Sequence, residues 1–157
     1  MYRSILVALD GSRSAARVLD EAIAVARGDG ARLTLIAVAA PPRWRCTSPY
    51  VVPFPTDADL ESEAHRIVEE AEARVPDGIP VSTVVRHGCV SKAILDRVAA
   101  AEHDLVIMGS HGRGPLRALL LGSVSRAVAA RSPVPVRIVR ERSVQERPAA
   151  VRPAAIA

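Results

Sequence analysis

The sequence predicts an α/β protein: a single doubly wound, five-stranded parallel sheet of strand order 3-2-1-4-5, with helices on both faces. Two observations predict this fold. Short, near-continuous apolar runs alternate along the chain with longer segments of helical period, as they do where helices cover both faces of a parallel sheet. The chain has 157 residues, of which 49% are hydrophobic and 24% charged, and this suits one ordinary domain.

Five segments are expected to be strands, and they are residues 5–9, 33–38, 81–85, 105–108 and 134–139. The first four are near-continuous apolar runs, expected to be covered on both faces. The last begins at Val134, ends at Val139 and contains Pro135, which cannot donate to a ladder. Arg137 also interrupts its apolar residues, and both features place it at an edge of the sheet. Five strands with four helices fit a flavodoxin-like order better than a six-stranded dinucleotide fold.

The segments between the strands have apolar residues at steps of three and four, which is typical of helices with one buried face. The first helix is expected to begin after Ser12 as its N-cap and to stop at Gly28. The second is expected to open with a capping box of Thr56 and Asp59. A third covers roughly residues 91–101, and a fourth is expected to begin near Ser123.

The net charge of +4 and the pI of about 9.8 favour a nucleic-acid partner at first sight. However, 17 acids are interspersed among the 21 basic residues, and no block of five like charges occurs. The four aromatic residues are also few for a surface that stacks bases. The distribution of charge therefore argues against nucleic-acid binding.

Two cysteines, Cys46 and Cys89, form neither a Cys-x-x-Cys pair nor a zinc signature. They are expected to be unpaired thiols in a reducing compartment. No apolar run reaches the ~18 residues of a membrane span, and the first ten residues lack the long apolar core of a secretory signal. We therefore expect a cytoplasmic protein without a membrane segment.

A glycine-rich segment follows the fourth strand, where the sheet is expected to carry its ligand. In a doubly wound sheet of this order, ligands bind between the loops after the first and fourth strands. Four of the chain's nine glycines lie between Gly109 and Gly122. Glycine lets backbone N–H groups approach a polyanion closely, and the helix expected to begin at Ser123 offers its N–H groups and dipole to phosphate.

The glycine spacing is Gly-x2-Gly-x9-Gly-Ser. It is not a P-loop, because no Gly-Lys-Ser/Thr occurs, and it is not the Gly-x-Gly-x-x-Gly dinucleotide fingerprint. Ser123 and Ser125 can add hydroxyl donors, and Arg113 can offer a charge. A flexible connection with a glycine at the helix entry remains the alternative interpretation.

The sequence resembles the universal stress protein family. Three segments carry the resemblance: residues 5–12 (Ile-Leu-Val-Ala-Leu-Asp-Gly-Ser), 104–114 (Asp-Leu-Val-Ile-Met-Gly-Ser-His-Gly-Arg-Gly) and 121–125 (Leu-Gly-Ser-Val-Ser). Residues 132–136 are similar to the family's last strand, and the resemblance covers residues 2–140. Family members with the Gly-x2-Gly-x9-Gly-Ser/Thr signature bind ATP. The resemblance thus implies an ATP-binding stress-response regulatory protein, with Mg²⁺ accompanying the nucleotide.

The same resemblance implies the nucleotide contacts. They are Ala8, Leu9, Asp10, Val38, Met108, Gly109, Gly112, Arg113, Gly122, Ser123, Val124 and Ser125. The glycines and serines of this set are expected at the phosphates and ribose, Asp10 at the base or ribose, and Val38 at adenine through its backbone. An Asx turn or a helix cap is the lesser alternative for Asp10, whereas composition alone favours plain core at least as much for Val38 and Met108. His111 is better read as an exposed loop histidine than as a general base.

The resemblance also implies a homodimer that pairs through the last strand, which agrees with the edge position argued above. No dedicated carboxylate base lies near the glycine loop, so hydrolysis is expected to be slow or absent, with at most weak ATPase activity. Two alternatives remain open. One is a dimeric interaction module that binds AMP, cyclic AMP or no nucleotide, and the other is an enzyme acting on a nucleotide-activated substrate.

Two stretches are irregular. Residues 40–56 hold three of the four aromatics, which either cover the site or merely pack on the surface. Residues 143–157 lack periodicity and are expected to be a flexible tail, so the nucleotide-binding domain is expected to span residues 1–142.

Overall fold

The computed structural model describes residues 1–12, 14–40, 55–110 and 121–140. Strands and helices alternate along these residues as the sequence predicts. They are β1 (Ser4–Ala8), α1 (Ala15–Asp29), β2 (Arg32–Ala39), α2 (Asp57–Glu72), β3 (Val81–His87), α3 (Val90–Ala100), β4 (Leu105–Gly109), α4 (Ser123–Arg131) and β5 (Val136–Val139). Residues 143–157, expected to be a flexible tail, lie outside the described residues. So do residues 41–54, which form most of the irregular stretch expected either to cover the site or to pack on the surface.

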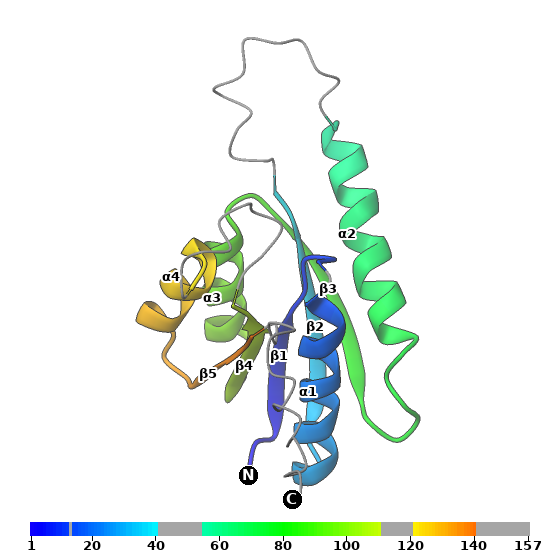
Figure 1. The fold of residues 1–157 in the computed structure, drawn as a ribbon, viewed down its shortest axis with the longest axis vertical. Helices are drawn as coiled ribbons and strands as arrows, with labels where there is room; N and C mark the ends of the chain where they lie inside the picture. The colour runs from blue at the N-terminus through cyan, green and yellow to red at the C-terminus, as the bar shows by residue number, and fades with distance from the viewer. Residues whose placement is uncertain (13, 41–54, 111–120, 141–157) are drawn as a thin grey trace, which may run out of the picture.

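The strands form one five-stranded sheet of order β3-β2-β1-β4-β5 (Figure 1). Each neighbouring pair is parallel, so the predicted fold class is confirmed. β1 lies at the centre, paired with β2 on one side and with β4 on the other. The short apolar runs form buried strands because helices exclude water from both faces of this central part.

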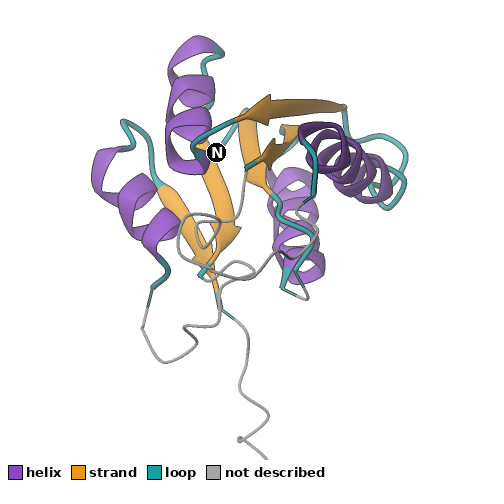
Figure 2. Ribbon diagram, turned by 90° about the horizontal axis from the view of Figure 1, so that it is seen from above, coloured by secondary structure: helices purple, strands orange, loops and turns teal. Residues whose placement is uncertain are grey.

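Helices cover both faces of the sheet (Figure 2). α1 and α2 share one hydrophobic core with Ile5 and Val7 of β1. Leu6 points to the opposite face, where it packs in a second core with residues of α3 and α4 such as Ile94 and Val128. The alternation of side chains along β1 thus builds two cores from one strand.

The two edges of the sheet differ from the central strands. β5 lies at an edge, as predicted from Pro135 and Arg137. β3 forms the other edge, and the expectation that this apolar run is covered on both faces is wrong, since Ser82, Thr83 and Arg86 are exposed. An edge strand has one sheet neighbour only, and helices cover it incompletely.

The ends of α1 differ from the sequence prediction. The helix is preceded by Ser14, not Ser12, at the N-cap, and it continues past Gly28 to a C-cap at Gly30. Gly30 adopts the left-handed φ of 68°, and its N–H bonds to the carbonyl of Ala26. Asp29 remains helical, and its carboxylate accepts a 2.7 Å bond from the N–H of Tyr2. Gly30 therefore ends the helix, and Gly28 lies within it.

The capping box of α2 is confirmed. Thr56 Oγ1 accepts from the N–H of Asp59 at 3.1 Å, and the Asp59 carboxylate accepts from the N–H of Thr56 at 2.7 Å. The Thr56 hydroxyl also donates to this carboxylate, at 2.8 Å. The backbone N–H of Thr56 and, to a smaller extent, its hydroxyl lower the pKa of Asp59. A carboxylate at this end also suits the helix dipole.

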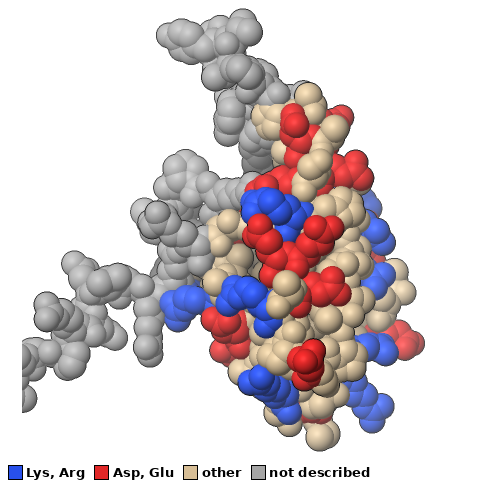
Figure 3. Space-filling model, turned by 90° about the vertical axis from the view of Figure 1, so that its right-hand side faces the viewer, with Lys and Arg blue, Asp and Glu red and all other residues tan. Residues whose placement is uncertain are grey.

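Acidic side chains gather on the face formed by α2 (Figure 3). The helix has acids at positions 57, 59, 61, 63, 69, 70 and 72. Arg66 pairs with Glu63 and Glu70 on this surface. Although the chain carries a net charge of +4, this face is acidic and unsuited to a polyanion.

Candidate functional site

The carboxyl ends of β1 and β4 lie side by side at the centre of the sheet. Ala8 is paired with Met108 in the β1–β4 register, and the N–H of Leu9 bonds to the carbonyl of Ile36 in β2 at 2.9 Å. After this point the chain leaves β1 toward the α1 face and leaves β4 toward the α4 face. This divergence is the switch point at which doubly wound sheets bind ligands, and we call this region the crevice.

The turn after β1 is shaped by Asp10 and Gly11. The Asp10 carboxylate accepts a 3.0 Å bond from the N–H of Ser12, and Gly11 adopts a left-handed φ of 69°. Asp10 thus forms the Asx turn that its position also allowed, while remaining half-exposed at the crevice. No second hydrogen bond reaches its carboxylate from the described residues, which leaves acceptor capacity toward the crevice.

Val38 and Met108 approach the same edge from neighbouring strands. Val38 is the penultimate residue of β2 and packs, half-buried, against the core of the α3 and α4 face. Met108 is 5% exposed and belongs to the same core. Gly109 follows it as the last residue of β4. The structure brings these residues to the crevice beside Ala8, Leu9 and Asp10, with most of the Met108 side chain committed to packing.

Ser110 ties the end of β4 to its neighbours. Its N–H donates to the carbonyl of Val139 in β5 at 2.9 Å. Its carbonyl accepts from the N–H of Gly122 at 2.7 Å and from the hydroxyl of Ser125 at 2.9 Å. Sequence reasoning missed this residue, because its contribution is made by backbone groups that any side chain would share.

α4 begins beside the end of β4, and no side chain of the described residues caps its start. Gly122, which has no side chain, is the N-cap, and no acid lies in the first turn. The N–H of Arg126 bonds to the carbonyl of Gly122 at 3.0 Å and closes this turn. An uncapped helix start presents N–H donors and the positive end of the dipole, which is the chemistry that binds phosphate.

The two predicted serines of this turn take opposite positions. Ser123 is exposed and Val124 half-buried, whereas Ser125 is 2% exposed. The Ser125 hydroxyl faces the carbonyls of Ser110 and Gly122, at 2.9 and 3.1 Å. Gly112, Arg113 and His111 lie outside the described residues, so their assignments stay predictions.

A hollow of about 200 Å³ adjoins the turn after β1. Its apolar floor includes Leu9 and Ile67, and Arg66, Glu70 and Arg74 lie at its polar rim. The contribution of α2 was not predicted, because its apolar stripe is indistinguishable from ordinary core in the sequence. The hollow lies between the turn after β1, α1 and α2.

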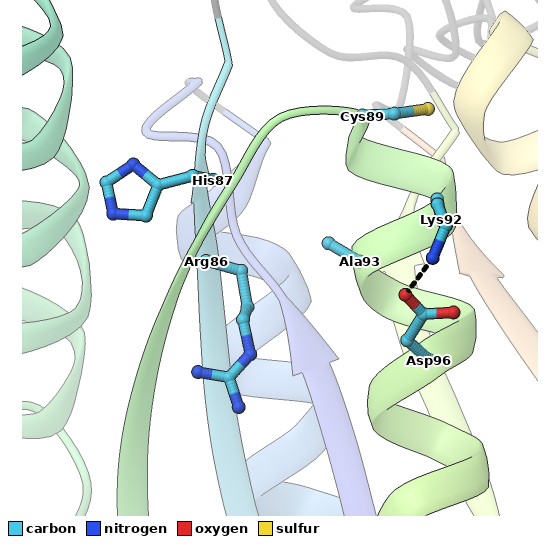
Figure 4. Close-up of a pocket in the computed structure, with 6 residues that line it drawn as sticks. All are labelled: Arg86, His87, Cys89, Lys92, Ala93 and Asp96. Carbon is cyan, nitrogen blue, oxygen red and sulfur yellow. Dashed lines mark hydrogen bonds and ion pairs between the residues drawn. The ribbon is translucent and has the colours of Figure 1, made fainter.

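A second hollow, of about 160 Å³, lies at the far side between the end of β3 and α3 (Figure 4). Its charged side chains do not converge. His87 points away toward Glu61 of α2, at 3.6 Å, and Lys92 pairs with Asp96 at 2.6 Å. The Asp96 contact raises the pKa of Lys92. This arrangement offers no focused site for a ligand.

Two further properties concern the described parts of the chain. They contain no group of three or more His, Cys, Asp or Glu residues able to hold a metal ion. Their helices also lack the combination of length and apolar character that crossing a membrane requires.

The strand order defines a doubly wound α/β protein, a class in which ligands bind at the carboxyl ends of the central strands. Residues 1–140 match the Universal stress protein family. A universal stress protein of Thermus aquaticus is 33% identical over 142 residues, which cover 89% of this chain and 100% of that protein. Universal stress protein YxiE of Bacillus subtilis is 30% identical, covering 89% and 100%. This chain belongs to the universal stress protein family.

Solved structures of the family share the fold. A universal stress protein in complex with cAMP superposes with a TM-score of 0.60 at 26% identity. The match covers 88% of this chain and 97% of that one.

Proposed function

We propose that this protein is an ATP-binding regulatory member of its family, with the nucleotide held between the loops after β1 and β4. The observation that carries the proposal is the uncapped start of α4 beside the paired ends of β1 and β4. The first turn of such a helix offers N–H donors of the kind that bind a phosphate group, next to the switch point of the sheet. The Gly-x2-Gly-x9-Gly-Ser spacing adds support, because it resembles the ATP-binding branch of the family.

The proposed contacts divide by chemistry. Gly109, Ser123 and Val124 supply backbone donors and a hydroxyl near the phosphates. Gly122, whose N–H bonds to Ser110, has no side chain that would block their approach. Asp10 keeps acceptor capacity for ribose or base hydrogen atoms. The remaining proposed contacts are Ala8, Leu9, Val38, Met108, Gly112, Arg113 and Ser125. The hollow beside Leu9 offers apolar surface of the kind a purine ring buries.

Mg²⁺ would be held chiefly by the phosphates of the nucleotide. Magnesium is commonly bound through one or two carboxylates together with substrate phosphates, and Asp10 is the carboxylate at this crevice. The donor set fits such an ion without a dedicated protein cage. We propose that hydrolysis is slow or absent, because Asp10 is engaged in its own turn and phosphoryl transfer needs a positioned nucleophile.

AMP or cyclic AMP is the second candidate ligand. A related structure, 26% identical, contains cAMP. These nucleotides share adenine and ribose with ATP but differ in phosphate length, so the choice depends on how many donors the start of α4 and the adjoining loop contribute. With AMP or cyclic AMP as with ATP, the regulatory role of the protein would depend on whether the nucleotide is bound.

The direct test is a calorimetric titration with ATP and Mg²⁺, followed by AMP and cyclic AMP, on protein checked by absorbance for co-purified nucleotide. Gly122→Glu is expected to abolish binding. Gly122 has φ −65° and ψ 162°, which any residue adopts, and a carboxylate at a helix start is itself favourable. The fold should therefore persist while the new charge excludes phosphate.

Gly28→Glu is the matched control. It adds the same charge at an exposed helical position, where a new Cβ meets no atom within 4 Å. It should bind ATP as the wild type does. Wild-type affinity in Gly122→Glu would refute the assignment of this helix start to phosphate.

We also propose a homodimer formed by antiparallel pairing of β5. Pro135 and Val139 direct their carbonyls toward β4, accepting from Val106 and Ser110 at 3.0 and 2.9 Å. Because backbone groups alternate in direction along a strand, the N–H of Val136 faces the open edge. A second copy could pair there and remove the exposed edge.

Val136→Pro removes that outward N–H and should convert a dimer to monomer in light scattering. Val136→Ala removes similar packing but retains the N–H, and it should stay dimeric. If both variants keep the wild-type mass, pairing through this edge is wrong.

A further inference from the structure

Ser125 lies where three elements meet. Its hydroxyl is 2.9 Å from the carbonyl of Ser110, at the end of β4, and 3.1 Å from the carbonyl of Gly122, at the start of α4. The N–H of Gly122 bonds to the same Ser110 carbonyl at 2.7 Å, and the N–H of Ser110 bonds to Val139 of β5 at 2.9 Å. One buried hydroxyl therefore links the end of β4 to the start of α4.

The hydroxyl of Ser125 acts together with the Gly122 N–H bond and the packing of Val124 to hold the first turn of α4. α4 has nine residues, of which Ser125 and Val128 are buried. Val128 anchors the middle of the helix in the α3 and α4 core. A helix this short is marginal by itself, so the direction of its first N–H groups follows from the anchor nearest to them.

The hydroxyl of Ser125 is buried and directed at two backbone carbonyls, whereas Ser123 is exposed. A hydroxyl has one proton to donate, and the proton of Ser125 is directed at buried carbonyl oxygens. Consecutive helical residues are separated by about 100°, so two residues two positions apart face nearly opposite directions. Ser123 and Ser125 cannot both present hydroxyls to one phosphate from this helix.

We infer that Ser125 is a positioning residue, which fixes the start of α4 against β4 so that its backbone N–H groups stay aimed at an anionic ligand. The inference rests on the proposed nucleotide function of the crevice. Donors that are already oriented cost little further ordering when the ligand binds. Loss of the hydroxyl lets the first turn move, and ligand binding must then restrain it.

The test compares four proteins at a temperature where each is fully folded: wild type, Ser125→Ala, Ser125→Thr and Ser123→Ala. ATP with Mg²⁺ is titrated by calorimetry, and amide hydrogen exchange is measured at Gly122. Loss of one buried hydrogen bond predicts a Kd for Ser125→Ala raised about fivefold to tenfold. Exchange at Gly122 should quicken in the same variant.

Ser125→Thr should restore both properties, because helical threonine also bonds the carbonyl three residues back. Ser123→Ala should leave exchange at Gly122 unchanged, which separates a ligand contact from a positioning role. A merely structural role for Ser125 lowers the melting temperature and leaves the affinity of the folded protein unaltered. Wild-type affinity in folded Ser125→Ala would overturn the inference.

Failure of the proposed function gives a different result. Wild type that binds no adenine nucleotide refutes the function, and the positioning role is refuted with it. The exchange measurement then reports whether the link itself holds the start of α4: unchanged protection at Gly122 in Ser125→Ala would show that the hydroxyl does not hold the turn either.

Discussion

The amino and carboxyl ends of the central strands differ in how far their polar groups are hydrogen-bonded within the protein. At the amino end, Asp104 accepts from the N–H groups of Arg3 and Ser4 at 2.7 and 3.1 Å. Ser4 Oγ lies 3.0 Å from His103 Nδ1 and accepts from Arg32 Nε at 3.2 Å. At the carboxyl end, the start of α4 has no side-chain cap. At the amino end most of these polar groups are paired with one another, whereas the start of α4 offers donors.

This difference separates stability from binding along the same strands. β1 and β4 begin in the closed cluster of Ser4, Arg32, His103 and Asp104, and they end at the open crevice. Polar groups paired within the protein stabilise the fold, whereas a ligand needs groups that are not yet paired. Substitutions at the amino end should therefore affect unfolding, and substitutions at the carboxyl end should affect binding.

Asp104→Ala provides the largest expected effect on stability. The substitution removes the acceptor of two backbone N–H groups that join β1 to the start of β4. Hydrogen bonds to charged groups contribute up to a few kcal/mol each, and this pair is partly exposed, so we expect a loss of about 2 kcal/mol. Urea denaturation followed by circular dichroism measures it. Calorimetric affinity for ATP should remain that of the wild type.

Asp77→Ala is the matched control, since Asp77 is an exposed carboxylate between α2 and β3. It should leave the denaturation midpoint unchanged. The separation of stability from binding is refuted if Asp104→Ala weakens nucleotide binding at a temperature where the variant is folded. In that case the two ends of the sheet are coupled and do not act separately.

The fold was predictable because its signals are local and repeated. Apolar runs set the strands, the three- and four-residue steps set the helices, and Thr56 with Asp59 marked a helix start that the structure confirms. The end of α1 was not predictable, because two glycines compete for it. The helix ends at Gly30, and Asp29 just before it accepts a hydrogen bond from Tyr2, a residue distant in sequence.

The site was predictable in place but only partly in detail. The glycine spacing located the loops, yet it gave Ser123 and Ser125 the same role. Helical geometry could have separated them, because residues two positions apart face nearly opposite directions. Which of the two serines is buried depends on how the start of α4 lies relative to the end of β4, and local sequence does not determine this. The polar cluster around His103 left no sequence signal, since it joins groups from the beginnings of three strands that are distant in sequence.

The smallest expected effect concerns the pH dependence of the closed end. His103 is 5% exposed, and its Nε2 is buried with no hydrogen-bond partner among the described residues. Burial lowers the pKa of His103 below its usual 6.5, and nearby Arg97 and Arg32 lower it further, while Asp104 acts in the opposite direction. The folded protein therefore keeps this imidazole neutral at a pH where the unfolded chain protonates it.

The sign of the effect follows from proton uptake. Below pH 6.5 the unfolded state binds more protons at this residue than the folded state, so stability is complete above that pH and falls as the pH decreases toward the lowered pKa. The loss approaches about 1.4 kcal/mol per pH unit within this window. His103→Asn, which retains a polar group near the Nδ1 position, should be less stable at pH 8 but should show a flatter dependence between pH 7 and 5. His65→Asn, at an exposed position of α2, should keep the wild-type slope. An equal slope in wild type and His103→Asn would mean that acid acts elsewhere, and the closed amino end would then not be the acid-sensitive part of the sheet.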